Sequence, residues 1–167
     1  KLNAATIPAQ TPVPRKDMII DGMSGSTVFS TIDLMDGFYQ ILMREEDVPL
    51  TAVSTPSGML WEWLVMPQGL SNAPAMFNRM VTNVLRPLRS FAPSYFDDIY
   101  IHSKAQNGKT DMQVHLEHLR QVFEVLVANQ LYANLKKSMF CAPEIDGCPA
   151  VSRLHGSVCE PLVSGRV

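Results

Sequence analysis

The sequence predicts an α+β fold in which an antiparallel sheet is backed by two helices. Residues 27–34 and 95–102 are rich in β-branched and aromatic side chains, a composition typical of strands. Residues 73–88 and 111–129 instead repeat apolar side chains at helical spacing. With 167 residues and 46% hydrophobic content, the chain is long enough to bury a single core. We therefore expect one domain, or part of one.

The N-terminal segment is expected to be extended and then briefly helical. Prolines at positions 8, 12 and 14 disfavour helix before residue 15, and residues 16–25 are predicted to form a short helix that stops near Gly22 or Gly25. The absence of an initiating Met and of a signal-peptide core suggests a piece of a longer polyprotein. No run of about 18 apolar residues occurs, so we expect no membrane span and no membrane partner.

Three carboxylates lie at the ends of the two predicted strands. Asp33 closes the first strand, and Asp97 and Asp98 form the turn of a hairpin within residues 95–102. An acidic pair at a hairpin turn is more often a solvent-exposed turn than a catalytic site. A third carboxylate near the pair favours the catalytic interpretation. The separation of 97 − 33 = 64 residues allows the two strands to be neighbours in one sheet. Three carboxylates at one sheet edge repel one another, and oxygen ligands of this kind suit Mg²⁺.

A second hairpin and a helix are predicted between these strands. Residues 50–55 and 59–66 have strand composition, and the Pro-Ser-Gly sequence at 56–58 suits a turn between them. The following helix has Ser71 or Asn72 as its N-cap and Pro74 near its first helical position.

The helix at 111–129 and a final pair of strands, at 131–133 and 138–140, are predicted in the C-terminal part. His115 and His118 lie on adjacent turns of this helix, but a metal site needs three or four ligands, so structural or solvent-exposed histidines are favoured. The predicted buried stripe of the helix consists of Leu116, Leu119, Val122, Phe123 and Leu126.

Cysteine usage and net charge restrict the class of protein. Cys141, Cys148 and Cys159 lack C-x-x-C spacing, so reduced thiols in an intracellular protein are expected rather than a zinc site. The net charge of −2 contrasts with the basic excess of most free-standing nucleic-acid binders. If the chain acts on nucleic acid, we expect two explanations for this acidic charge to hold together. Bound metal offsets the negative charge of the carboxylates, and the basic surfaces lie in other parts of the polyprotein.

Four blocks resemble the successive motifs of a reverse transcriptase. They read FSTIDL at 29–34, GFYQI at 37–41, MPQGLSNAP at 66–74 and YFDD at 95–98, and they are similar to those of long-terminal-repeat retrotransposons of the Ty3/gypsy type. The resemblance covers about residues 2 to 145 and implies a polymerase palm-type antiparallel sheet with partial fingers. It divides the chain into a fingers-to-palm lead-in (1–25), the palm with partial fingers (26–145) and a divergent tail (146–167). In that tail we expect poor order, and we consider a frame change in the source DNA near residue 146.

The resemblance implies an RNA-directed DNA polymerase, a nucleotidyltransferase that adds dNTPs to a primer 3′-hydroxyl on an RNA or DNA template. Two Mg²⁺ ions, or Mn²⁺ as an alternative, would clamp the attacking and leaving oxygens. The aromatic at Phe38 would lie beneath the sugar, where its ring would clash with a 2′-hydroxyl. The implied site residues are Asp33, Asp97 and Asp98 as catalytic metal ligands; Leu34, Phe38, Gln68 and Gly69 at the nucleotide; and Arg15, Tyr95 and Lys136 as weaker nucleic-acid contacts.

The implied partners are an RNA template, a DNA primer, dNTPs, and the thumb, RNase H and integrase portions of the polyprotein. The implied location is cytoplasmic, within a virus-like particle. Two alternatives stay open on the residues alone. One is a catalytically inactive palm remnant that acts as a structural or interaction module, and the other is a two-metal phosphodiesterase, although the His-rich ligand sets common in such enzymes are missing.

Overall fold

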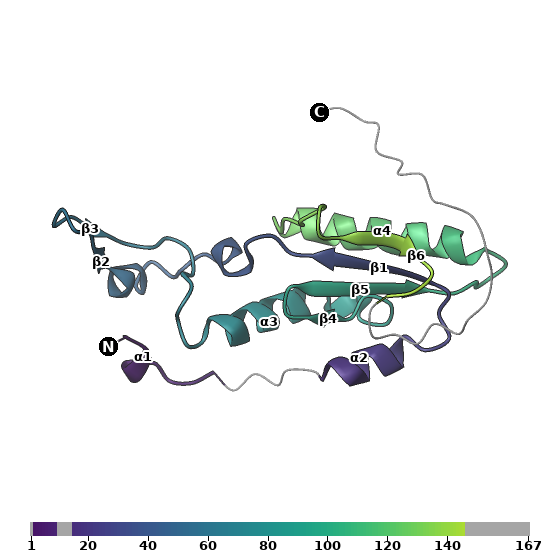
Figure 1. The fold of residues 1–167 in the computed structure, drawn as a ribbon, viewed down its shortest axis with the longest axis horizontal. Helices are drawn as coiled ribbons and strands as arrows, with labels where there is room; N and C mark the ends of the chain where they lie inside the picture. The colour runs from purple at the N-terminus through teal and green to yellow at the C-terminus, as the bar shows by residue number, and fades with distance from the viewer. Residues whose placement is uncertain (1, 10–14, 146–167) are drawn as a thin grey trace, which may run out of the picture.

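The structure is a computed structural model that describes residues 2–9 and 15–145. Its centre is a four-stranded antiparallel sheet with the strand order β4-β5-β1-β6 (Figure 1). The strands are β1 (Val28–Asp33), β4 (Ser94–Tyr95), β5 (Asp98–Ser103) and β6 (Met139–Ala142). The prediction that the two Asp-bearing strands are neighbours is confirmed, because β1 pairs directly with β5. The predicted tail at 146–167 lies outside the described residues.

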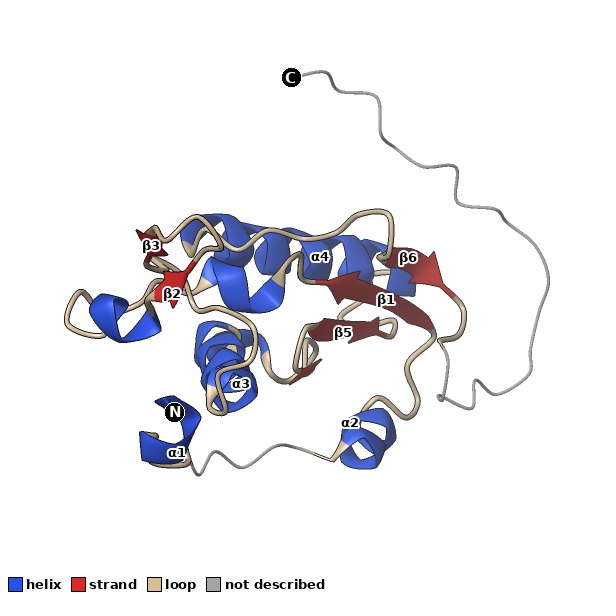
Figure 2. Ribbon diagram, turned by 60° about the vertical axis from the view of Figure 1, so that its left-hand side comes forward, coloured by secondary structure: helices blue, strands red, loops and turns tan. Residues whose placement is uncertain are grey.

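Two helices cover one face of this sheet. They are α3 (Ala73–Val84) and α4 (Asp111–Ala128), and their apolar stripes pack on the alternate strand residues that point toward them. Figure 2 shows α3 and α4 on the sheet in a second view. The buried core contains Ile32, Ile99 and Ile101 from the strands, Phe77 and Val81 from α3, and Leu119, Val122 and Leu126 from α4. This arrangement confirms the predicted α+β fold.

The opposite face of the sheet is covered by a shorter helix, α2 (Lys16–Gly22), which ends at Gly22 as predicted. Ile19 and Met23 pack there against Phe29 of β1 and Tyr100 of β5, in a second apolar cluster that also contains Ile145. This cluster includes Phe29 near the start of β1, whereas Asp33 at the end of the strand is half-buried. The prediction of extended backbone before residue 15 was wrong at residues 2–5, which form the short helix α1 (Leu2–Ala5) ahead of Pro8.

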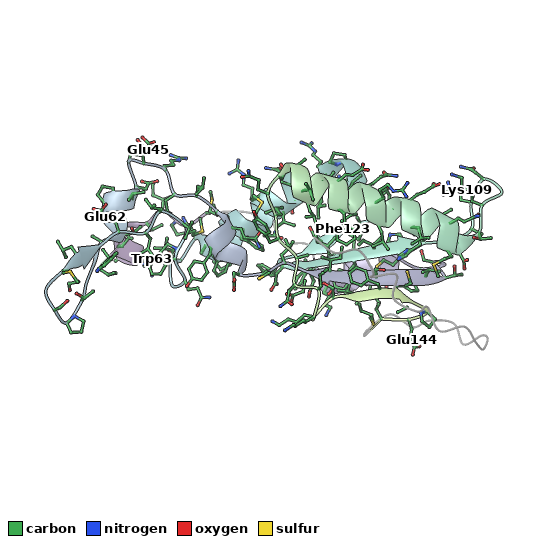
Figure 3. All side chains as sticks on the ribbon, turned by 90° about the horizontal axis from the view of Figure 1, so that it is seen from above. Glu45, Glu62, Trp63, Lys109, Phe123 and Glu144 are labelled. Carbon is green, nitrogen blue, oxygen red and sulfur yellow. The ribbon has the colours of Figure 1, made fainter. Side chains whose placement is uncertain are left out.

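An extension projects from the sheet between β1 and α3 (Figure 1). It contains the 3₁₀ helices η1 (Gly37–Gln40) and η2 (Val48–Thr51) and the hairpin strands β2 (Val53–Ser54) and β3 (Leu60–Trp61). Glu45 and Glu62 lie on this extension, at the opposite end of the molecule from Lys109 (Figure 3). The predicted hairpin is present, but its strands have two residues each.

The prediction of strand at residues 50 and 51 was wrong. These residues end η2, in which Pro49 occupies an early helical position that requires no N–H donor. The Thr51 hydroxyl donates to the carbonyl of Val48 at 2.6 Å and accepts from the amide of Trp63 at 2.9 Å. These side-chain bonds hold the backbone in a turn rather than in a ladder.

Two further elements are shorter than the sequence predicts. Helix α3 ends at Val84 instead of residue 88, because Pro87 cannot continue an α-helix, and the 3₁₀ helix η3 (Arg86–Leu88) follows. Residues 131–133 do not form the predicted strand. They make one isolated bridge, between Ala133 and Leu34, and the amide of Asn134 then donates to the carbonyl of Asp33, so the chain turns across the end of β1.

Helix α4 buries most of the predicted stripe, with one exception. Leu119 and Val122 are buried as expected, but Leu116 is 49% exposed, so its prediction was wrong. His115 is fully buried instead, one turn before Leu119 on the same face. The apolar pattern missed it because a histidine becomes a core residue only when its ring nitrogens find partners. Within the described residues, no helix is both long and apolar enough to cross a membrane.

Candidate active site

The candidate active site is the pair of carboxylates that β1 and β5 place opposite each other. Asp33 and Asp98 are direct partners in the antiparallel register, so their side chains leave the same face of the sheet. Tyr100 and Phe29 lie on that face too, because they alternate with the core residues that face α3 and α4. The carboxylate pair therefore lies on the face opposite the two long helices.

The third carboxylate belongs to the tight turn between β4 and β5. Phe96 has φ of 52°, a left-handed conformation that turns the chain between the two strands. Asp97 follows it, and its carbonyl accepts a hydrogen bond from the amide of Leu34 at 2.9 Å. This bond ties the turn to the end of β1, so Asp97 and Asp98 are held against the strand that carries Asp33.

The backbone of Asp33 is fixed from its other side by residues that precede β6. Its amide donates to the hydroxyl of Ser138 at 3.3 Å, and its carbonyl accepts from the amide of Asn134 at 2.8 Å. Asp33 is thus held between two segments far away in sequence. Such fixing limits the movement of a carboxylate that has to keep a set position.

Burial and neighbouring charges act on Asp98. Partial burial raises the pKa of its carboxyl, the nearby carboxylates of Asp97 and Asp33 raise the pKa further, and the hydroxyl of Tyr100 and the charge of Lys16 lower it. The hydroxyl of Tyr100 donates to Asp98 Oδ2 at 3.3 Å. Burial and the carboxylates raise the pKa of Tyr100 to about 12, so it stays a donor at neutral pH.

These residues fit a divalent cation with few protein ligands. No group of three or more His, Cys, Asp and Glu side chains within residues 2–9 and 15–145 is arranged to hold a metal, so the structure does not assemble the expected three-carboxylate cluster as one set. Mg²⁺ characteristically takes one or two carboxylates and completes its shell with waters and substrate phosphates. The facing carboxylates of Asp33 and Asp98, whose mutual repulsion a cation would relieve, meet that requirement.

The four residues predicted to contact a nucleotide are found in different environments. Gln68 and Gly69 are exposed in the loop before α3, and Gly69 has φ of 95°, which favours glycine. Phe38 is half-buried and packs edge-on against Phe77, with ring centroids 5.8 Å apart. Leu34 is buried in the core with 2% exposure, so its side chain offers no surface to a nucleotide.

The three residues predicted as weaker nucleic-acid contacts also differ in their exposure and in their partners. The guanidinium of Arg15 is exposed but bonded to Asp17, with N–O distances of 3.1 and 2.5 Å. Lys136 is exposed in the loop before β6. Tyr95 is half-buried and packs edge-on against Phe96, and it lies beside Asp98 in the register of β4 and β5. Among these three, Tyr95 is the one that the strand pairing brings next to the carboxylates.

The sequence-based prediction missed Tyr100 as a member of the site. Its aromatic side chain indicated only a strand. Alternation along β5, however, places residues two apart on the same face, and Tyr100 lies two residues after Asp98. That periodicity, applied to Asp98, would have identified Tyr100 as its neighbour.

Comparison with known proteins identifies the family of the chain. Residues 1–150 match the family model described as "Reverse transcriptase (RNA-dependent DNA polymerase)". The chain is 43% identical over 145 residues to the retrovirus-related Pol polyprotein from transposon 297 of Drosophila melanogaster, and 35% identical over 162 residues to that from transposon opus of the same organism. These matches cover 86% and 96% of this chain but only 13% and 16% of the relatives.

Solved structures give the same result. A foamy viral protease-reverse transcriptase in complex with double-stranded DNA is similar with a TM-score of 0.75 and 26% identity, over 86% of this chain and 24% of that one. The foamy viral enzyme in complex with an RNA/DNA hybrid has a TM-score of 0.71 and 26% identity, over 83% and 18% of the two chains. The chain therefore belongs to the reverse transcriptase family, as the reverse transcriptase part of a retrotransposon or retroviral polyprotein.

Proposed function

We propose that this chain is the palm, with part of the fingers, of an RNA-directed DNA polymerase that adds dNTPs to a primer 3′-hydroxyl on an RNA or DNA template. The observation that carries the proposal is the direct pairing of Asp33 with Asp98 at the end of two adjacent strands, with Asp97 in the adjoining turn. Carboxylates of two strands meet there on a half-exposed face of the sheet.

The roles of the carboxylates follow from this pairing. The proposed ligands of Mg²⁺, or of Mn²⁺ in its place, are Asp33 and Asp98, with Asp97 as a further ligand from the adjoining turn. When two such ions are bound, they lower the pKa of the primer hydroxyl and stabilise charge on the leaving pyrophosphate oxygen. The hydroxyl of Tyr100 supports the ionised form of Asp98 through its hydrogen bond.

The nucleotide would be bound by Gln68 and Gly69, which are exposed in the loop before α3. Phe38 would exclude a 2′-hydroxyl with its ring, which the contact with Phe77 holds in one orientation. Leu34 would act only through its backbone, because its side chain belongs to the core. Arg15, Tyr95 and Lys136 are proposed as contacts to template or primer backbone.

The biological setting is also a proposal. The four sequence blocks favour a Ty3/gypsy-type element, and the Pol polyproteins that the chain resembles support a larger protein. The thumb, RNase H and integrase portions are proposed as the other parts of that protein. The matching structures are protease-reverse transcriptases bound to double-stranded DNA and to an RNA/DNA hybrid, which supports template and primer as partners. We place the protein in cytoplasmic virus-like particles, and residues 1–25, 26–145 and 146–167 keep the division into lead-in, palm with partial fingers, and tail.

The first prediction tests this function by Mg²⁺-dependent extension of a primed RNA template. Asp33→Asn and Asp98→Asn keep the side-chain shape but remove the charge that binds a cation, so each should lower extension by at least about a hundredfold. Asp21→Asn is the matched control, because Asp21 is an exposed carboxylate on α2, and its extension should equal that of the wild type.

The possible results separate the alternatives. Strand cleavage in place of incorporation would identify a phosphodiesterase. A wild-type chain that shows neither reaction, and that also binds no Mg²⁺ in a titration, would be a non-catalytic remnant. Equal extension by Asp33→Asn and Asp21→Asn would show that the carboxylate pair is not the metal site.

A further inference from the structure

Two asparagine side chains fasten the N-terminal segment to the loop that carries Gln68 and Gly69. Asn3 Nδ2 donates to the carbonyl of Gly69 at 2.8 Å, and Asn3 Oδ1 accepts from the amide of Ser71 at 3.0 Å. Both ends of one side-chain amide therefore bind the same loop, 66 and 68 residues away in sequence. In Figures 1 and 2, α1 (Leu2–Ala5) accordingly lies beside the start of α3.

Asn72 makes the reciprocal contact from the loop to the N-terminal segment. Its Nδ2 donates to the carbonyl of Ile7 at 2.7 Å, and its Oδ1 accepts from the amide of Ala9 at 2.9 Å. Asn72 is the N-cap residue of α3, yet its side chain makes no capping hydrogen bond. Asparagine is among the preferred capping residues, so here its amide is used to hold residues 7–9 instead of the helix start.

The two amides enclose the loop whose exposed residues the proposed function assigns to the nucleotide. Asn3, Gln68 and Gly69 line one cleft of about 450 Å³, together with Tyr39 and Trp63. The rings of Tyr39 and Trp63 stack with their centroids 5.8 Å apart and form an aromatic wall of that cleft. Asn3 therefore bonds directly to a residue that lines this cleft beside Gln68.

We infer that Asn3 and Asn72 are positioning residues for dNTP binding, which act by fixing the loop 67–71 against the N-terminal segment. This inference rests on the proposed function. A planar side-chain amide that donates one hydrogen bond and accepts another fixes both the position and the orientation of the segment it binds. With either amide removed, the Gln68–Gly69 turn samples other positions, and the nucleotide has to order it on binding. The dNTP affinity then falls while the chemical step at the carboxylates keeps its rate.

The test uses the full chain with Asn3→Ala and Asn72→Ser. Serine is as good an N-cap as asparagine, so the second variant leaves the start of α3 intact while it shortens the side chain. Asn83→Ala is the matched control, since Asn83 is an exposed asparagine on the same helix. Amide exchange measured by NMR should accelerate at Ser71 in Asn3→Ala and at Ala9 in Asn72→Ser.

The kinetic readout is primer extension with varied dNTP. Each variant removes two hydrogen bonds, so it should raise the KM for dNTP by roughly five- to a hundredfold, with kcat within about twofold. The double variant should show less than the product of the two effects, because both amides hold the same pair of segments. A fall in kcat with unchanged KM, or faster exchange with unchanged KM, would overturn the positioning role, and so would unchanged exchange.

A separate measurement distinguishes failure of the inference from failure of the proposed function. Titration of the wild-type chain with dTTP and Mg²⁺ should shift the NMR amide signals of Gln68 and Gly69. If dTTP does not shift these signals in the wild type and the wild type does not extend a primer, the proposed function is overturned, and the inference falls with it. The asparagine variants then need no comparison. A wild type that passes both tests, beside asparagine variants that match it, overturns the inference alone.

Discussion

At the scale of single residues, the imidazole of His115 is a polar group buried in the core. Ser30 Oγ lies 2.7 Å from its Nε2, and Ser103 Oγ lies 2.8 Å from its Nδ1, so both ring nitrogens are hydrogen-bonded. Ser103 also lies 2.8 Å from His118 Nδ1, and the ring of His118 stacks on Phe91. These bonds link α4 to β1 and β5, and they explain how a histidine is accommodated in the core.

Burial, reinforced by the neighbouring His118 and His102, lowers the pKa of His115 to about 4, although Asp111 opposes the shift. In the unfolded chain the pKa is near 6.5, so the unfolded state binds a proton that the folded state excludes between these values. The stability contributed by neutral His115 is therefore complete above about pH 6.5 and is lost progressively as the pH falls toward 4.

We expect the urea midpoint of the wild type to fall between pH 7.5 and 5, with about 2 kcal/mol of stability lost through His115. His115→Asn should be less stable at pH 7.5 but should show a weaker decline toward pH 5, since it lacks this titration. The remaining decline comes from His102 and His118, whose pKa values are also lowered by burial. Equal pH slopes for His115→Asn and the wild type would contradict this account.

At the scale of elements, helix α4 has a complete capping box at its start. Thr110 Oγ1 accepts from the amide of Gln113 at 3.3 Å, and the amide of Thr110 donates to Gln113 Oε1 at 3.0 Å. The carboxylate of Asp111 lies in the first helical turn, where negative charge is favoured. Since α4 contacts both β1 and β5, a loose start to this helix would weaken the sheet that holds the site.

Removal of the capping hydroxyl should therefore lower the stability of the whole domain. Thr110→Ala is expected to cost about 1 kcal/mol in chemical unfolding, and Thr110→Ser, which keeps the hydroxyl, should stay within about 0.5 kcal/mol of the wild type. If Thr110→Ser loses as much as Thr110→Ala, the effect comes from the methyl group and not from the cap.

At the scale of the whole molecule, net charge limits how tightly the chain would bind the template and primer that the proposed function assigns to it. Its 14 Lys and Arg residues are outnumbered by 16 Asp and Glu residues. Affinity for a duplex depends largely on how many phosphates the basic side chains neutralise. A chain with net charge −2 therefore offers few such contacts, and the exposed Lys136 and Lys137 before β6 are candidates for them.

We expect fluorescence anisotropy with a primed template to show weak binding with a shallow salt dependence. The slope of log K against log salt should correspond to fewer than about four phosphates. Lys136→Ala should reduce the slope by about one, whereas Lys109→Ala should leave it unchanged, because Lys109 pairs with Glu117 at 2.6 Å at the other end of α4. A slope near ten in the wild type would show a basic surface that the composition does not predict.

Much of the fold and part of the site are determined by the sequence alone. The two long strand runs and the start of α3 at Asn72 and Pro74 follow from local composition and capping chemistry. The hairpin turn was also predicted, but it lies at Phe96 and Asp97, and Asp98 begins β5 instead of sharing the turn. The four motif blocks were sufficient to predict the reverse transcriptase family, and the family match confirms this prediction. These features are local, so neighbouring residues specify them without reference to the rest of the chain.

Only the tertiary structure decides what depends on contacts between distant segments. The register that sets Asp33 opposite Asp98 arises when two strands bury their alternate residues against α3 and α4. The burial of His115 and the exposure of Leu116 depend on which face of α4 meets the serines of the sheet. The bond from Asn3 to Gly69 joins residues 66 positions apart, and no local pattern specifies such a partner.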